Sequence, residues 1–220
     1  MKNICFSGLI LLGLLGTACN SDSDSDTDPP VVLPPIEVRT EIPDSNFEAA
    51  LVALDLDDEV DGSVLTSRIV GITRLDVEAE GISDLSGIED FAALIDLNVR
   101  SNELVSLDVA SNSELLFVWA ENNELTSLNL GANQNIEKVG ASGNNLTGLT
   151  VTEYSTLQLL DLANNSIEAM DVSTLPLPTF NEFAIQGNPL TCILVSPEQF
   201  EAIPPSWSKD EEDTWSLDCE

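Results

Sequence analysis

The sequence predicts a solenoid in which each turn contributes one short parallel β-strand to an inner sheet. Three observations support this fold class. Apolar residues recur every 21 to 23 residues, an asparagine holds the same place in most copies, and neither half of a copy has the 3.6-residue periodicity of a helix. Six copies begin at Ile72, Leu94, Leu115, Ile136, Leu157 and Phe180.

The copy that begins at Leu94 reads LIDLNVRSNELVSLDVASNSE, and three further copies repeat its apolar positions. The spacing L-x-x-L-x-L-x-x-N-x-L resembles that of the leucine-rich repeat family. The resemblance implies a right-handed coil with a strand such as 97–99 on its inner face. Because 21 residues leave little room for a helix and Asn-rich turns follow each half, we expect a mostly extended or irregular outer face.

The first residues are organised like an export signal. A short basic start precedes an apolar run from Ile4 to Leu15, which is shorter than the roughly 20 residues that span a bilayer. Residues 15–19, LGTAC, resemble the processing site of bacterial lipoproteins, with cleavage before Cys19. Gly16 stands where that family has a larger aliphatic residue, and ordinary signal peptidase would make the same cut without attaching lipid.

Cysteine counting favours lipidation of Cys19. Of the four cysteines, Cys5 leaves with the signal, and Cys192 and Cys219 can pair with each other. Acylation explains the one left over. We therefore expect a bacterial cell-envelope protein, lipid-anchored to the outer membrane and either periplasmic or surface-exposed, which meets the membrane only through its anchor.

The stretch after the cysteine, NSDSDSDTDPPVVLPP, cannot bury a core and is expected to be a disordered tether. The expected boundaries are a signal peptide at 1–18, an acidic and Pro-rich tether at 19–37, an N-terminal cap at 38–71, repeats at 72–190 and a C-terminal cap at 191–220.

One convincing helix precedes the repeats, over residues 44–54. Ser45 and Glu48 have the spacing of a capping box. Three apolar residues share one face of this helix: Phe47, Leu51 and Leu54. The segment 42–89 also resembles the N-terminal region of secreted bacterial leucine-rich repeat proteins. A helix here would cover the apolar edge of the first turn.

The acidic loop after this helix lacks the pattern of a calcium site. With Asp57, Glu59 and Asp61 as ligands, Gly62 falls correctly at the sixth position of an EF-hand loop. The twelfth position, where a bidentate glutamate is required, is Arg68. The sequence therefore predicts no metal and no cofactor.

The recurring asparagines are interpreted as structural. An asparagine amide offers two donors and an acceptor, which can satisfy backbone groups that a turn leaves unpaired. The leucine-rich repeat family uses this residue in a ladder inside the coil, and Glu80 replaces it in the first copy. The members of the ladder are Asn102, Asn123, Asn144, Asn165 and Asn188.

The end of the chain resembles the C-terminal cap of secreted leucine-rich repeat proteins, which a disulfide closes. That resemblance, together with export, implies a bond between Cys192 and Cys219. Trp207 and Trp215 are expected to cover the last turn rather than to bind a ligand.

Composition excludes several classes of function. The formal net charge of −32 repels nucleic acids and anionic lipids, so neither is an expected partner. The chain has no histidine, no nucleophile motif and no phosphate-binding loop. We expect no catalytic residue and no enzymatic activity.

Function is expected on the inner face, where residues on either side of each core position point outwards. Phe117 and Trp119 stand there side by side, although nothing structural requires aromatic residues, and Arg100 and Lys138 flank them. The candidate ligand-binding residues are Asp96, Asn98, Arg100, Phe117, Trp119, Glu121, Lys138 and Asp161.

The sequence thus predicts a monomeric binding or adhesion module for a protein, peptide or glycan, with its site on the inner face. Two alternatives stay open: a structural envelope lipoprotein without a specific ligand there, and a calcium- or glycan-dependent surface factor.

Overall fold

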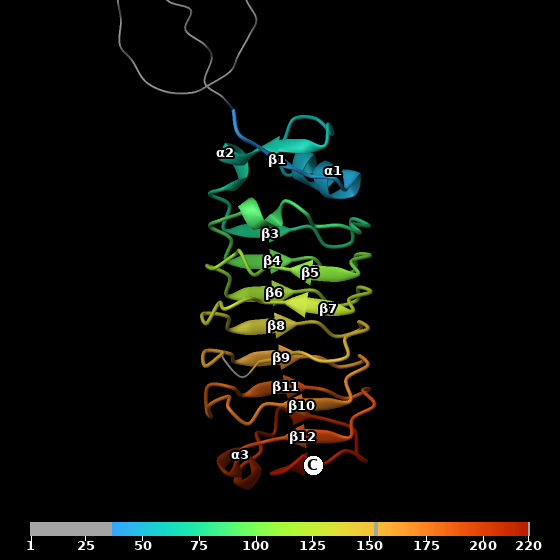
Figure 1. Cartoon of the computed structure of the whole chain (residues 1–220), viewed down its shortest axis with the longest axis vertical. Helices are drawn as coiled ribbons and strands as arrows, with labels where there is room; N and C mark the ends of the chain where they lie inside the picture. Colours follow the sequence, from blue (N-terminus) through green and yellow to red (C-terminus); the bar gives the residue numbers. More distant parts are fainter. Residues whose placement is uncertain (1–36, 152–153, 220) are drawn as a thin grey trace, which may run out of the picture. The chain divides into compact units, whose positions relative to one another are not determined.

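The computed structural model describes residues 37–151 and 154–219. The predicted signal peptide, Cys19 and nearly all of the tether lie outside the described residues. Residues 37–220 form one compact unit, in which the chain winds as a leucine-rich repeat solenoid (Figure 1). The predicted fold class is confirmed. In the part that is described, no helix has the length and apolar character needed to cross a membrane.

Seven short strands form the inner sheet, and all neighbours in it pair in parallel. In chain order they are β3 (Arg74–Asp76), β4 (Asp96–Asn98), β6 (Phe117–Trp119), β8 (Lys138–Gly140), β9 (Leu159–Asp161), β11 (Glu182–Ala184) and β13 (Trp207–Ser208). The middle residue of each of the first six strands is buried, so the residues beside it face away from the core.

The outer side of the coil is extended, as predicted. It holds two parallel sheets, and between them residues 148–151 form no strand. The first sheet contains β5 (Ser106–Asp108) and β7 (Ser127–Asn129), and the second contains β10 (Ala169–Asp171), β12 (Cys192–Leu194) and β14 (Trp215–Ser216). In the first turn this side carries a 3-10 turn, η1 (Ile88–Asp90).

Each repeated asparagine binds backbone groups of two successive turns. Asn123 donates its amide to the carbonyls of Val99 and Ala120 at 3.0 and 3.1 Å, and its oxygen accepts from the N–H of Leu104 at 3.1 Å. The same contacts recur at the other four positions: Asn102, Asn144, Asn165 and Asn188. These side chains are buried and their amide groups are hydrogen-bonded to the backbone, so they stabilise the coil and are not available to a ligand.

A second pair of asparagines, which the sequence analysis missed, lies at another corner of the coil. Asn112 donates to the carbonyl of Ile88 at 2.8 Å, and Asn133 donates to that of Leu115 at 2.6 Å. The two are 21 residues apart, but the next copy has Tyr154 in this place. Two copies are too few for the pattern to be noticed.

The N-terminal cap contains the predicted helix, α1 (Ser45–Ala53), but the predicted capping box is wrong. Asp44 is the N-cap residue, and one of its carboxylate oxygens accepts from the N–H groups of Asn46 and Phe47. Glu48 instead turns away from the helix start and accepts from three successive backbone N–H groups, at 61–63. Leu54 lies at the end of the helix and is 45% exposed, so it is not part of the buried face.

Two short strands complete this cap. β1 (Arg39–Glu41) pairs antiparallel with β2 (Ser63–Leu65), and α2 (Thr66–Ile69) leads into the first turn. The second carboxylate oxygen of Asp44 accepts from Ser83 and Asp84, which belong to that turn. One side chain therefore joins the cap helix to the coil.

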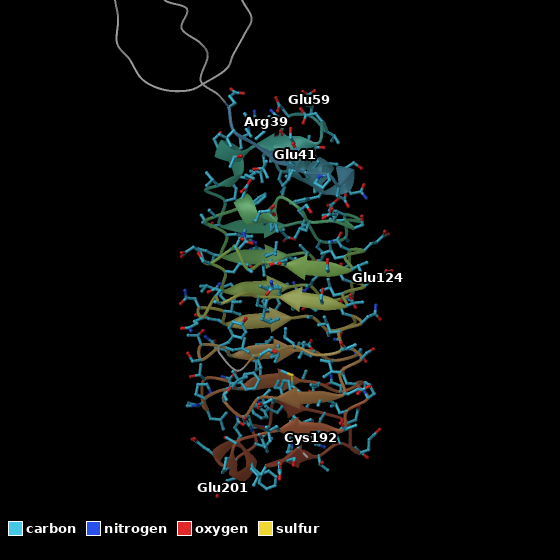
Figure 2. The ribbon with its side chains drawn as sticks, in the orientation of Figure 1. Arg39, Glu41, Glu59, Glu124, Cys192 and Glu201 are labelled. Atoms are coloured by element: carbon cyan, nitrogen blue, oxygen red, sulfur yellow. A yellow bond between two sulfur atoms is a disulfide. The ribbon has the colours of Figure 1, made fainter. Side chains whose placement is uncertain are left out.

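The C-terminal cap continues the coil by one more turn. β13 extends the inner sheet and β14 extends the outer one, while α3 (Pro197–Glu201) connects the two layers. Trp207 is buried at 7% exposure against Phe180 and Phe183, with ring centroids 5.1 and 5.6 Å away. The Cys192–Cys219 disulfide is confirmed, with Cα atoms 5.8 Å apart, and Cys192 lies in the last turns (Figure 2).

One corner of every turn has left-handed backbone conformation. The residues there, with φ between 56° and 73°, are Ala79, Ser101, Asn122, Gly143, Asn164 and Gly187. Only glycine adopts this conformation without strain, yet the first two positions are occupied by alanine and serine. Because the residue type varies, the sequence analysis did not detect this corner.

Candidate functional site: the inner sheet

The predicted binding residues lie on the exposed side of the inner sheet, in columns set by the strand register. Pairing aligns Asp96 with Phe117 and Lys138 in one column, and Asn98 with Trp119 and Gly140 in the next. This is the register that a side-chain period of two requires. Residues from three successive turns are therefore brought beside one another.

Trp119 lies across three strands. Its Nε1 donates to Oδ1 of Asp96 on β4 at 3.2 Å. On the other side, a Cβ at Gly140 of β8 would lie 3.0 Å from Cε3 of the indole and 2.5 Å from Oε1 of Glu121. Gly140 thus leaves the space in which the indole and Glu121 rest. The prediction of an exposed aromatic pair requires correction, because both Phe117 and Trp119 are half-buried.

Arg100 covers the Trp119 ring. Its guanidinium carbon lies 4.5 Å from the ring centroid, and its Nε lies 2.7 Å from Oε2 of Glu121. The Glu121 side chain is only 15% exposed, which reduces solvent screening of this ion pair. Stacking and pairing together hold the guanidinium in one orientation on the face.

Lys138 stands next to Phe117, with Nζ 6.0 Å from the ring centroid. Within 37–151 and 154–219, each of the four arginines has a carboxylate within 4.0 Å, but Lys138 has none. In so acidic a chain, a half-buried lysine that forms no ion pair with any described residue is a candidate for binding an anionic group of a ligand. We call Asp96, Arg100, Phe117, Trp119, Glu121 and Lys138 the aromatic centre.

Two of the predicted residues do not join this centre. Asn98 is 7% exposed and donates to Asp76 at 2.9 Å and to Glu78 at 3.1 Å, so its amide is used within the first two turns. Asp161 lies further along the sheet on β9, where its Oδ1 accepts from the N–H of Ala163 at 3.1 Å. The sequence pattern placed both on the correct face but could not show their partners.

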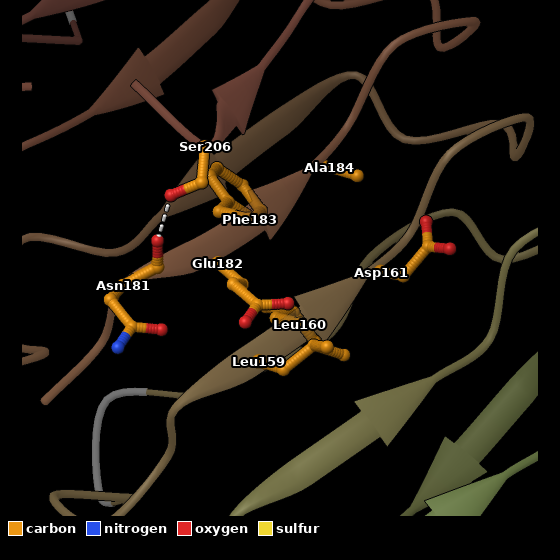
Figure 3. Close-up of a pocket in the computed structure, with 8 residues that line it drawn as sticks. All are labelled: Leu159, Leu160, Asp161, Asn181, Glu182, Phe183, Ala184 and Ser206. Carbon is orange, nitrogen blue, oxygen red and sulfur yellow. Dashed lines mark hydrogen bonds between the residues drawn. The ribbon is translucent and has the colours of Figure 1, made fainter. Parts of the chain in front are cut away.

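Asp161 borders a hollow that the sequence analysis did not predict. The hollow has a volume of about 510 Å³ and opens on the inner sheet over β9 and β11 (Figure 3). Ser206 closes one end by donating to the carbonyl of Asn181. Its lining residues are Leu159, Leu160, Asp161, Asn181, Glu182, Phe183, Ala184 and Ser206.

The acids of the calcium alternative do not converge. Asp61 is bound by Arg39 and Ser63, whereas Asp57 is 5% exposed and neither of its carboxylate oxygens has a hydrogen-bond partner. Burial raises the pKa of Asp57, and the negative charges of Asp58 and Glu48 raise it further. No group of three or more His, Cys, Asp or Glu side chains suited to a metal ion occurs in the described segments.

Comparison with known proteins identifies neither a family model nor a curated relative that matches this chain. Three solved structures from Listeria monocytogenes are similar to it. The functional domain of InlJ, which includes a cysteine ladder, has 20% identity and a TM-score of 0.43 over 83% of this chain and 50% of that one. The internalin InlF has 17% identity and a TM-score of 0.38, over 80% of this chain and 71% of that one. Internalin C2 has 16% identity and a TM-score of 0.45, over 82% and 92%. The chain spans only half the length of the InlJ domain, and at these identities and TM-scores nothing about function is transferred.

Proposed function

We propose that this protein is a non-enzymatic binding or adhesion module of the bacterial cell envelope, which recognises a protein, peptide or glycan through its inner sheet. One observation carries the proposal. In the aromatic centre, two aromatic side chains that are not part of the hydrophobic core hold two cations on the face of an acidic chain. Other turns have Asn98, Gly140, Asp161 and Ala184 at the position of Trp119, so the repeat itself does not require an aromatic residue there and a ligand is the better reason for it.

The aromatic centre is arranged before any ligand arrives. Arg100 is held by the Trp119 ring and by Glu121, and none of its other side-chain N–H groups donates to a side chain of the described residues. Fixing a long side chain in advance removes part of the entropy cost of binding. Tryptophan and arginine are also the residue types that most often dominate binding energy.

The dimensions of the inner sheet limit what it can bind alone. Seven strands at a spacing of about 4.8 Å make a sheet about 29 Å long. Strands of two or three residues make it narrow, so its face is smaller than the roughly 800 Å² that a stable protein interface buries on each partner. A peptide or glycan fits within the sheet, whereas a globular partner must also contact the caps or edges.

Replacing Trp119 tests the proposal. We expect Trp119→Ala to reduce capture of the partner from a cell-envelope extract by tenfold or more, because it removes the ring on which Arg100 rests. Val105→Ala is the matched control, since Val105 is 51% exposed and lies off the inner sheet. Circular dichroism must show that both variants fold. Equal capture by both would contradict binding through the inner sheet.

The anchor is proposed from Cys19 and the tether that follows it. Sixteen extended residues at about 3.1 Å each would hold the solenoid up to about 50 Å from the membrane. Mass spectrometry of the mature N-terminus measures this directly, with Cys19→Ser as the unmodified control. An unmodified cysteine in the natural chain would refute the anchor without affecting the binding proposal.

A further inference from the structure

We infer that the hollow over β9 and β11 receives an arginine side chain of the partner. This inference deepens the proposed function, because it names the chemistry that one part of the inner sheet recognises. It depends on the shape of the hollow, on the two carboxylates that border it and on the lack of an ion pair to either carboxylate among the described residues.

The floor of the hollow is apolar. Leu159 and Ala184 project from the exposed side of β9 and β11, and Leu160 and Phe183 lie beneath them in the core (Figure 3). A volume of about 510 Å³ exceeds what one side chain needs, so a segment of the partner backbone can enter as well. This surface suits the aliphatic stem of a long side chain.

Two carboxylates border this apolar floor. Glu182 is exposed and its carboxylate makes no hydrogen bond or ion pair among the described residues, while Asp161 uses one oxygen for the N–H of Ala163. No cation of the described residues pairs with them: the four arginines pair within the first half of the solenoid, and Lys138, on the neighbouring strand, has no carboxylate of the described residues within 4.0 Å. Lys209 donates to the backbone carbonyl of Asp210. Neither carboxylate at the hollow therefore has an ion pair among the described residues.

An arginine side chain complements both features. Its stem can lie on Leu159 and Ala184, and its guanidinium has five N–H donors in a fork that two carboxylates can share. The net charge of −32 would attract such a cation from a distance, and the hollow would fix where it stops.

The test uses N-acetyl-arginine amide as the probe and N-acetyl-citrulline amide, which has the same shape without the charge, as its control. The protein is the mature chain with Cys19→Ser, labelled with ¹⁵N for NMR titration. We expect saturable shifts at the amides of Leu159, Asp161 and Ala184 with the arginine probe and none with citrulline.

Two variants locate the binding. Asp161→Asn with Glu182→Gln should weaken the probe about three- to tenfold, as expected for partly exposed charge pairs. The matched control, Glu124→Gln with Glu168→Gln, removes the same charge from exposed positions outside the hollow and should change affinity less than twofold. Ala184→Leu fills the hollow without changing its charge and should weaken binding too, while a thermal scan shows that it folds.

Equal effects of the two charge-neutralised variants would overturn the inference, because the net charge alone would then account for binding. Shifts spread over the whole acidic surface would do the same. The proposed function is tested separately: Trp119→Ala should leave probe binding intact. If Trp119→Ala abolishes partner capture but the probe finds no site, the proposed function stands and the arginine site does not.

Discussion

Asn123→Ala should lower the free energy of unfolding by about 2–3 kcal/mol. The side-chain oxygen of Asn123 accepts a hydrogen bond from the N–H of Leu104, a residue with no exposed surface. Removing the amide leaves this donor buried and unpaired, which costs about 1–3 kcal/mol. The two carbonyls lose less, because Val99 also accepts from Asn102 and Ala120 also accepts from Asn144.

The same accounting predicts a larger effect at the end of the ladder. Asn188 donates to the carbonyl of Ile185 at 2.8 Å, and no later asparagine shares that carbonyl. Asn188→Ala therefore orphans an acceptor as well as the N–H of Ile167. We expect it to cost about 1 kcal/mol more than Asn123→Ala.

Urea denaturation followed by circular dichroism measures these differences, and amide hydrogen exchange at Leu104 reports the local effect. Asn135→Ala is the control, because Asn135 is exposed and its side chain has no hydrogen bond in the described structure; a change within about 0.5 kcal/mol is expected. An unchanged midpoint for Asn123→Ala, with unaltered exchange at Leu104, would refute the ladder as a source of stability.

Three further predictions concern the caps and corners. For Asp44, burial favours a higher pKa, but hydrogen bonds from Ser83, Phe47 and Asp84 outweigh it and lower the pKa to about 2. The ionised Asp44 carboxylate therefore stabilises the fold above about pH 4, and this stabilisation is lost as the pH falls towards 2. Because Asp44 is partly exposed, its contribution to the free energy of unfolding is about 1–2 kcal/mol. Asp44→Ala should lower the free energy of unfolding by that amount at pH 7 but not at pH 2. Ala79→Gly should stabilise by about 0.5–1.5 kcal/mol in thermal unfolding, because it relieves a left-handed alanine; destabilisation would show that the corner is unstrained. Reducing the 192–219 disulfide should cost about 3–4 kcal/mol in the loop-entropy description, and an equal urea midpoint with and without reductant would contradict this.

Much of the solenoid was predictable because its signals repeat. Because six copies share the same spacing, a deviation in one copy does not hide the pattern. The core positions and the strand register could therefore be predicted from spacing alone. The same reasoning explains the failures in the caps, which occur once each. Ser45 and Glu48 have capping-box spacing, but Asp44 competes for the same N–H groups and Glu48 finds three unpaired N–H groups in the loop at 61–63.

The candidate site divides in the same way. Period-two alternation placed Arg100, Phe117, Trp119 and Lys138 on one face, since that depends only on the register. The alternation could not show that Arg100 stacks on the Trp119 ring or that Gly140 leaves space for that ring. Those facts depend on side-chain rotamers across three turns, which no spacing encodes.

The sequence by itself thus determined the coil, its core and which residues lie on the exposed side of the inner sheet, because a short repeat specifies the same local geometry again and again. Only the tertiary structure decided which outward side chains are free. It shows Asn98 bound to Asp76, Lys138 without an ion pair to any residue that the structure describes, and a hollow beside Asp161. The physical reason is that side-chain hydrogen bonds, ion pairs and hollows form between residues of neighbouring turns, about 20 positions apart in the sequence. Whether they form depends on the sizes of the side chains that lie beside one another there.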